Sequence, residues 1–418
     1  MGSELYPKKL LQNVATLIMG QSPPGSTYNE SGEGIPFYQG VRDFGERYPT
    51  RRVYCTAPTR FAETGDILFS VRAPIGEVNR ATEYCAIGRG LAAMRANSGF
   101  DTTYLEYVLR HIRSEWDILE GQGAVFGNAK KSDLENLLIP WPRDIEQRAI
   151  AHVLGSLDDK IELNRQMNRT LEKMAQAIFK SWFIDFDPVR AKAEGRDPGL
   201  PKEIASLFPD SFEDSEPGPI PKGWRATTIG SKFDLTMGQS PPGSTYNEED
   251  EGLPFFQGRR DFGFRYPSNR VYCTAPTRIA HAGDTLVSVR APVGDINMAY
   301  ETCCVGRGVA AVRHKSRSRS YTYYAMLALG ERFKSYEAEG TVFGAINKKQ
   351  FQNLPSIASQ PDIVSSFEKL TYPLDENIRS FEEEIRTLSE TRDTLLPKLI
   401  SGELRVPDAE KFIEEAGV

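Results

Sequence analysis

Residues 19–30 of this 418-residue chain read MGQSPPGSTYNE, and residues 237–248 read the same letters again. At the same spacing of 218 residues, RVYCTAPTR at 52–60 returns at 270–278, and SVRAP at 70–74 returns at 288–292. A period this long is far beyond the roughly 20–50 residues of solenoid repeats. The sequence therefore predicts a duplicated domain, with two similar ligands or one ligand that has internal symmetry.

Shorter segments that match between the two copies contain residues that favour turns. Gln39-Gly40, Arg42 to Gly45 and Gly88 to Gly90 recur at the same spacing, and residues 125–127 recur at 342–344. Their Gly, Pro and Asp residues are typical of turns, and the short β-branched and aromatic runs between them are typical of strands. Each copy then ends in a helical pattern, as at 104–119. We expect two mixed α/β domains.

A long segment of another kind follows each copy. In both segments the apolar positions recur at alternating steps of three and four, which is the heptad pattern of supercoiled helices. We expect the two helices to pack antiparallel, because an exposed amphipathic helix is marginal alone. Residues 157–182 would span roughly 40 Å, close to one turn of B-DNA, so the helices are a candidate spacer. The heptad positions are Leu154, Leu157, Ile161, Asn164, Asn168, Leu171, Ala175, Ile178 and Trp182, then Leu374, Ile378, Phe381, Ile385, Leu388, Arg392, Leu395 and Leu399.

These patterns predict an α+β chain: two duplicated domains separated by two long antiparallel coiled-coil helices. Pro, Gly and acidic residues gather between Asp185 and Gly223 and indicate a linker. The expected boundaries are a first domain at 1–143, a helical region at 144–186, a linker at 187–222, a second domain at 223–357, a second helical region at 358–405 and a tail at 406–418.

Basic and acidic residues are concentrated in different segments of the chain, although the net charge is only -6. Residues 259–319 hold 11 Lys and Arg against 4 Asp and Glu, whereas residues 361–418 hold 7 against 14. Basic segments favour contact with phosphates. No apolar run approaches the ~18 residues of a membrane span, so we expect a cytoplasmic protein. The five cysteines form no CxxC pair and are expected to be buried core residues.

The sequence contains no recognisable set of catalytic residues. The sequence has no Gly-x-Gly-x-x-Gly after a strand, no Walker loop and no Asn-Pro-Pro-aromatic tetrapeptide of the kind methyltransferases use. The four histidines lack a recognisable partner pattern, and we expect no metal site. Asp158-Asp159-Lys160 lies on the first heptad helix and is interpreted as a solvated face.

The repeated polar loops suit the reading of DNA bases better. Glutamine amides can pair bidentately with adenine, and arginines can take guanine edges or phosphates. For any single arginine, a carboxylate partner or a solvated position is an equal alternative, and Asp43 and Asp261 are expected to orient a neighbouring arginine. The predicted DNA-contacting residues are Gln21, Ser22, Thr27, Tyr28, Gln39, Arg42, Arg72, Arg89, Lys130 and Lys131, and in the second copy Gln239, Ser240, Thr245, Tyr246, Gln257, Arg260, Arg290, Arg307, Lys348 and Lys349.

Nearly the whole chain resembles the specificity (S, HsdS) subunit of type I restriction-modification systems. One departure is that the first domain starts at Leu5-Tyr6-Pro7 without the Gly-Trp pair that precedes the second. In each copy the resemblance includes a Gly-Gln-Ser-Pro loop, at 20–25 and 238–243, and a Phe-x-Gln-Gly segment, at 37–40 and 255–258. It also includes the entry into the second domain at Ile220 to Trp224, the helical region 157–183 and the C-terminal region 392–403.

The resemblance implies that each copy is a target recognition domain reading one half of a gapped site in double-stranded DNA. It also implies that the helices dock two methyltransferase (M) subunits, joined by restriction and translocation (R) subunits. Cofactors (S-adenosylmethionine, ATP and magnesium) would then belong to the partners, and this chain would have no catalytic site.

Nearly identical domains predict nearly identical half-sites, so we expect a near-palindromic target. The copies differ at Val41/Arg259, Glu46/Phe264, Glu63/His281 and Arg80/Met298, and in the loop after Gly127/Gly344, so the halves need not match perfectly. Two alternatives stay open: a stand-alone bipartite DNA-binding regulator that needs no partner, and an enzyme whose site has no recognisable motif.

Overall fold

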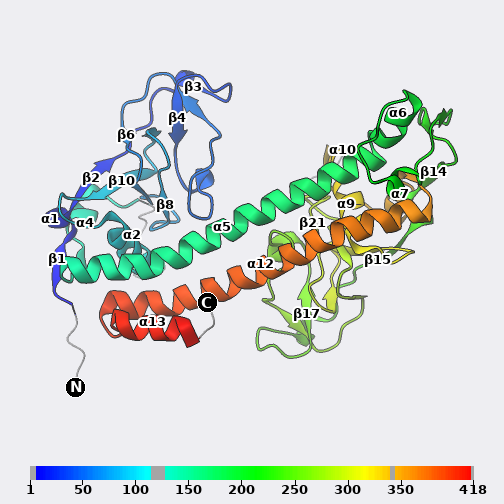
Figure 1. Ribbon diagram of the computed structural model, residues 1–418. Coiled ribbons are helices and arrows are strands. Elements are labelled where there is room, and N and C mark those ends of the chain that lie inside the picture. Colours follow the sequence, from blue (N-terminus) through cyan, green and yellow to red (C-terminus); the bar gives the residue numbers. More distant parts are fainter. Residues whose placement is uncertain (1–5, 114–127, 339–343, 416–418) are drawn as a thin grey trace. The chain divides into compact units, whose positions relative to one another are not determined.

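The computed structural model describes residues 6–113, 128–338 and 344–415 (Figure 1). The chain divides into two compact units, residues 1–164 with 384–418 (unit 1) and residues 165–383 (unit 2). Each unit therefore combines one copy of the repeat with half of each of two long helices. These are α5, Asp144–Phe183, and α12, Pro361–Ser401.

The described residues of unit 1 form a four-stranded sheet, a five-stranded sheet and a two-stranded sheet. In the antiparallel four-stranded sheet the order is β2-β10-β7-β8, and in the five-stranded sheet it is β3-β5-β4-β9-β6, with β4 and β9 parallel. Strand β1 pairs with β11 beside the helices. The elements are β1 Lys8–Leu10, α1 Leu11–Val14, β2 Ala15–Met19, β3 Tyr28–Asn29, β4 Ile35–Tyr38, β5 Tyr54–Cys55, β6 Phe61–Ala62, β7 Ile67–Ser70, β8 Val78–Arg80, β9 Cys85–Ile87, β10 Leu91–Ala96, α2 Thr102–His111, α4 Lys131–Glu135, β11 Leu138–Pro140 and α13 Val406–Glu415.

Unit 2 repeats this topology strand for strand: β15-β23-β20-β21, β16-β18-β17-β22-β19 and β14-β24. The duplication predicted from the sequence is thus a duplication of fold. The elements are β14 Arg225–Thr228, α8 Ile229–Lys232, β15 Phe233–Met237, β16 Tyr246–Asn247, β17 Leu253–Phe256, β18 Tyr272–Cys273, β19 Ile279–Ala280, β20 Thr285–Ser288, β21 Ile296–Met298, β22 Cys303–Val305, β23 Val309–His314, α9 Arg319–Leu327, α10 Gly330–Ala338, α11 Lys348–Gln352 and β24 Pro355–Ala358.

The two long helices run antiparallel within each unit. In unit 1, Arg392 of α12 donates to Asp158 of α5 at 2.7 Å, and Asn164 donates to Glu384 at 2.8 Å, so the numbers fall on α12 as they rise on α5. In unit 2, Asn168 donates to Glu382 at 2.6 Å. Every predicted heptad position is buried or half-buried, which confirms the seam. Asn164 and Asn168 face glutamates of the opposite helix, a pairing able to fix register.

The segments predicted as a linker and as a tail both carry short elements. Residues 187–222 form α6 Asp187–Ala193, α7 Lys202–Ala205, β12 Phe212–Glu213 and β13 Ile220–Pro221. Val189, Phe208 and Ile220 from this segment are buried in the core of unit 2. Ala409 of α13 is buried in the core of unit 1.

The helical pattern predicted at 104–119 corresponds to α2 for its first part, and residues 114–119 and 125–127 lie outside the described residues. All five cysteines are buried and free, as expected. In the part of the chain that the structure describes, no helix is long and apolar enough to cross a membrane.

Unit 2 contains a half-buried lysine, Lys232, whose charge should make stability depend on pH. The Lys232 ammonium donates to the Tyr321 hydroxyl at 2.6 Å and to the Ile357 carbonyl at 2.8 Å. Burial lowers the pKa of Lys232 to about 8, whereas an unfolded lysine titrates near ~10.4. Between these values the unfolded chain binds more protons, so the stability of the folded state rises with pH across this window.

We expect the free energy of unfolding to rise by about 2 kcal/mol more between roughly pH 7.5 and 9.5 in the parent than in Lys232→Met. Urea unfolding at both pH values measures this difference, and groups common to the two proteins cancel. Equal pH dependence in parent and variant would contradict the assignment.

Candidate nucleic-acid interface

The repeated loops of unit 1 are tied together by backbone hydrogen bonds. The amide of Gln21 donates to the carbonyl of Ile87 at 3.1 Å, and that of Gly88 donates to Tyr38 at 2.8 Å. The amide of Val71 donates to Gly90 at 2.9 Å. Further bonds extend the set to residues 59–60 and 128–130. We call the joined loops 20–22, 38–40, 59–60, 71–72, 88–90 and 128–130 the loop surface of unit 1.

Unit 2 has the same construction. The amide of Gln239 donates to Val305 at 3.0 Å, that of Gly308 to Gln257 at 3.0 Å, and that of Val289 to Gly308 at 2.9 Å. The loop surface of unit 2 comprises residues 238–240, 256–258, 277–278, 289–290, 306–308 and 345–348. The sequence placed these residues in separate motifs, and the fold brings them together in both copies.

Glycine is required where these loops touch. A Cβ on Gly20 would lie 2.1 Å from the carbonyl oxygen of Gly88, and a Cβ on Gly90 would lie 2.2 Å from that of Gln39. At Gly238 and Gly308 the corresponding distances are 2.1 Å and 2.4 Å. These contacts are backbone against backbone, so no side-chain movement could relieve them.

Most of the predicted arginines, which lie in the loop surfaces or two residues beyond them, are exposed and carry no internal partner. No hydrogen bond or ion pair joins the guanidinium of Arg42, Arg72 or Arg89 to another described residue, and the same holds for Arg260 and Arg290. The exception is Arg307, whose Nε donates to the Ser240 hydroxyl at 3.4 Å. Cations left unpaired in both copies are available to phosphates or guanine edges.

Sequence reasoning missed one pair of arginines. Arg60 and Arg278 are exposed, and their carbonyls accept from Ile87 and Val305, which places both residues in the loop surfaces. Neither guanidinium has a hydrogen-bond or ion-pair partner among the described side chains. The signal was present, because these arginines end the repeated RVYCTAPTR, but only the start of that run was interpreted, as a strand.

The repeated aspartates orient arginines, as predicted. Asp43 is buried, accepts from Arg52 at 2.8 Å and also accepts the amide of Gln39 at 2.7 Å. In unit 2, Asp261 accepts from Arg270 at 2.9 Å. Asp43 therefore also shapes the loop that carries Gln39.

Four predicted contact residues use their hydroxyl protons inside the loop. The hydroxyls of Thr27 and Tyr28 each donate at 2.7 Å, to the carbonyls of Pro24 and Pro23, and Thr245 and Tyr246 repeat both bonds. Ser22 accepts the amide of Arg89 at 3.1 Å. The carbonyls of Gln21 and Gln239 accept from threonine hydroxyls, while both glutamine side chains are exposed.

The remaining predicted glutamines and lysines lie in the loop surfaces or directly beside them. Gln257 is exposed and Gln39 is half-buried. Lys130, Lys348 and Lys349 are exposed beside the short helices α4 and α11, and Lys131 pairs with Glu135 at 3.3 Å.

The interpretation of Asp158 as part of a solvated face was wrong. Asp158 is buried, accepts from Arg110 at 2.9 Å and Arg392 at 2.7 Å, and accepts the Tyr107 hydroxyl at 2.8 Å. Burial acts to raise the pKa of Asp158, but the two arginines outweigh it and hold the pKa below its ordinary value. Asp158 therefore anchors the first domain to both long helices. Within the described residues, no three His, Cys, Asp or Glu side chains are grouped so as to hold a metal ion.

Comparisons with known proteins agree with this geometry. Residues 6–173 match the family model of the type I restriction modification DNA specificity domain. The MjaX specificity subunit of Methanocaldococcus jannaschii, assigned to the type I restriction enzymes, is 30% identical over 358 residues, covering 82% of this chain and 79% of its own. The MjaIX specificity subunit of the same organism is 27% identical over 379 residues, 87% of this chain and 83% of its own.

A solved structure shares the fold. The S subunit of a type I restriction-modification system from M. genitalium is 17% identical, and the match covers 96% of this chain and 97% of that one with a TM-score of 0.59.

Proposed function

Because this chain belongs to the DNA specificity subunits of type I restriction-modification systems, we propose that it binds a bipartite, gapped site in double-stranded DNA. Each unit reads one half of the site through its loop surface. The chain supplies sequence recognition, and catalysis is carried out by its partners.

The repeated cationic loop surface is the observation that carries this proposal. Both units expose glutamines and arginines at the same positions of the same fold, and Arg72 with Arg290 is a pair in which neither guanidinium has an internal partner. Glutamine amides pair with adenine, and arginine pairs with guanine or with phosphate. The close backbone contacts at Gly20 and Gly238 hold these side chains on a rigid frame, which precise recognition needs.

Partner binding follows from the helical regions. We propose that the long helices scaffold two methyltransferase subunits and, with them, the restriction subunits. Leu163, Met167 and Met174 are exposed on α5, which is compatible with a protein partner. S-adenosylmethionine, ATP and magnesium would be bound by those subunits, which extrude the target adenine from the duplex.

The recognised sequence should be nearly palindromic. Two loop surfaces with the same residues, reading opposite strands of one duplex, select nearly the same bases in each half. Methylome sequencing of cells that carry the chain with its methyltransferase partner should reveal a gapped site with related half-sites. Two unrelated half-sites would overturn this inference, and the absence of any chain-dependent methylation would overturn the proposed function.

A further inference from the structure

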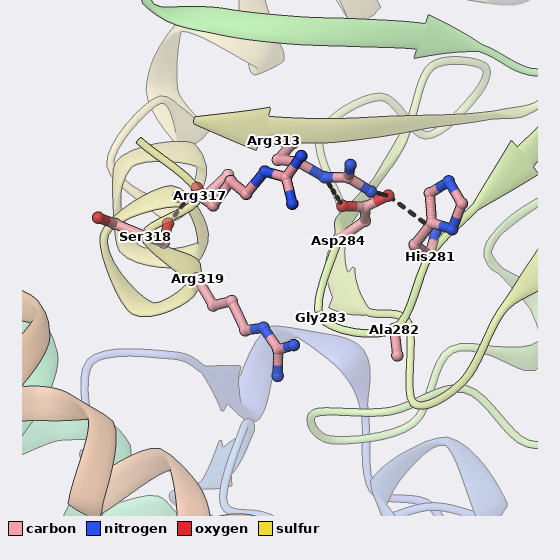
Figure 2. A pocket seen from close by; sticks show the side chains of 9 residues that line it. His281, Ala282, Gly283, Asp284, Arg313, Arg317, Ser318 and Arg319 are labelled. Carbon is pink, nitrogen blue, oxygen red and sulfur yellow. Dashed lines mark hydrogen bonds and ion pairs between the residues drawn. The ribbon is translucent and has the colours of Figure 1, made fainter. Parts of the chain in front are cut away.

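The two otherwise similar units differ at a hollow beside the helix that follows the last strand of the main sheet. In unit 2 this hollow has a volume of about 470 Å³ and lies between the turn after β19 and the start of α9. Figure 2 shows the side chains of Arg317 and Arg319 extending from one wall toward the turn of His281 and Asp284 on the other. The arginine nearest that turn, Arg313, pairs with Asp284 through two bonds of 2.5 and 2.7 Å.

The charge of this hollow is not balanced inside the protein. Arg313 and Asp284 neutralise each other, but no hydrogen bond or ion pair joins the guanidinium of Arg317 or Arg319 to any described residue. The helix end is not the source of the site, because Glu368 already accepts the backbone amides of residues 319–321. Two uncompensated cations therefore face a polar, open space.

Unit 1 lacks these cations at the same place. Its turn carries Glu63 where unit 2 has His281, and its helix begins at Thr102 where unit 2 has Arg319. Arg95 and Asp66 keep the pair, at 2.7 Å. With three arginines and one aspartate, the hollow of unit 2 has a net charge of +2 with His281 neutral, whereas Glu63, Asp66 and Arg95 leave −1 in unit 1.

The backbone of unit 2 adopts an unusual conformation to hold one of these arginines. Arg317 has a φ of 63°, a left-handed conformation that L side chains rarely adopt, and the matching turn of unit 1 uses Gly99 at 91°. A non-glycine residue in this region costs free energy and is kept where surrounding structure or function compensates. In unit 2 this free-energy cost arises at Arg317, whose side chain has no hydrogen-bond or ion-pair partner among the described residues.

The hollow continues the loop surface along the edge strand β19. Arg278, in the loop surface, directly precedes this two-residue strand, and His281 directly follows it. Three residues of extended chain cover roughly 10 Å, so a DNA strand that reaches Arg278 passes close to the hollow.

We propose that the hollow of unit 2 binds a phosphate of the DNA backbone next to the second half-site, and that unit 1 has no equivalent contact. This inference rests on the proposed function. Two domains that read similar bases would then contribute unequally to the salt-dependent part of DNA affinity, since each neutralised phosphate releases condensed counterions.

The test is a variant that gives unit 2 the residues of unit 1, Arg317→Gly with Arg319→Thr. Both substitutions suit the backbone, since glycine adopts positive φ freely. Binding of the full chain to a fluorescent duplex of about three helical turns is titrated between roughly 50 and 200 mM salt. The slope of log affinity against log salt should fall by about 1 in magnitude, the value for one neutralised phosphate. The matched control removes two exposed cations elsewhere in unit 2, Lys222→Thr with Arg225→Thr, and should leave the slope unchanged.

A second variant places the cations in unit 1, as Gly99→Arg with Thr102→Arg, and should steepen the slope. If the parent binds duplex DNA and neither variant changes its slope relative to the control, the inference is wrong and the proposed function stands. If inorganic phosphate protects the parent but not the Arg317/Arg319 variant from thermal unfolding while their DNA slopes agree, the hollow takes a free anion and the inference is again wrong. A parent chain that binds no duplex at low salt would overturn the proposed function together with the inference.

Discussion

Arg265→Met should lower the free energy of unfolding of unit 2 by about 3–5 kcal/mol, the effect of leaving a buried charge without its partner. Arg265 is fully buried, donates to Asp375 at 2.7 Å and to the Tyr324 hydroxyl at 3.0 Å, and lies 4.0 Å from the ring centroid of Tyr323. The pKa of Arg265 lies well above its ordinary value, because attraction from the tyrosines and Asp375 outweighs burial. Removing this cation strands the Asp375 carboxylate, which is also buried.

Two further variants separate the lost charge pair from lost packing. In Arg265→Met with Asp375→Leu both members of the 2.7 Å pair are gone. Glu172, which lies 3.4 Å from Arg265, keeps its charge but is partly exposed, so we expect much of the stability to return. The matched position in unit 1 is Arg47, whose partner Asp159 has a side chain that is 73% exposed. Water can solvate Asp159 after Arg47→Met, so that change should cost only about 1 kcal/mol. Urea unfolding of the four proteins measures these differences, and equal losses at Arg47 and Arg265 would contradict the argument.

The comparison of Arg47 with Arg265 shows what sequence could and could not predict. The repeat placed both arginines at equivalent positions, and the heptads correctly predicted the helices against which they pack, because periodic burial is written into local spacing. How deeply each arginine is buried does not depend on its local sequence. Arg265 is enclosed by Asp375 and by Tyr323 and Tyr324, which lie 50 to 110 residues further along the chain.

The burial of Asp158 was not predicted, for the same reason. On a single helix, an Asp-Asp-Lys run is typical of a solvated face. Its burial depends on Arg110, 48 residues away, and on Arg392, 234 residues away, which together make an interior carboxylate tolerable. Sequence spacing reports which face of a helix is apolar, and it does not report which distant cation will cover a polar position beside that face.

The candidate interface also combines features that the sequence could predict with features that it could not. The polarity and repetition of the loops were sufficient to select them as candidates for DNA contact, since turn chemistry and residue type are local properties. That the loops gather at one surface depends on the fold. Which hydroxyls stay free was not predictable, because Tyr28 and Tyr246 reach back five residues to the carbonyls of Pro23 and Pro241. Arg60 and Arg278 were missed because the repeated run that they end was considered only for the strand pattern at its start.

Gly238→Ala should disrupt the loop surface of unit 2, although it adds a single methyl group. The new Cβ would lie 2.1 Å from the carbonyl oxygen of Gly306 and 2.6 Å from that of Val309, and both atoms belong to backbone that is fixed by hydrogen bonds. The loop that carries Gln239 must therefore move away from the loop that carries Arg307. Overpacking of this kind costs about 3 kcal/mol, and displacement of the loops should abolish recognition of one half-site.

The repeated stretch supplies its own control. Gly243 lies five residues further along the same twelve letters, and a Cβ at Gly243 would meet nothing within 4 Å. Gly243→Ala should therefore leave both stability and recognition unchanged, so that the contrast between two glycines of one motif isolates the backbone contact. Thermal unfolding and methylome sequencing of cells carrying each variant measure the two effects. Retention of the parent methylation pattern by Gly238→Ala would show that the loops can separate without loss of reading, and the rigid-frame argument for base recognition would then be wrong.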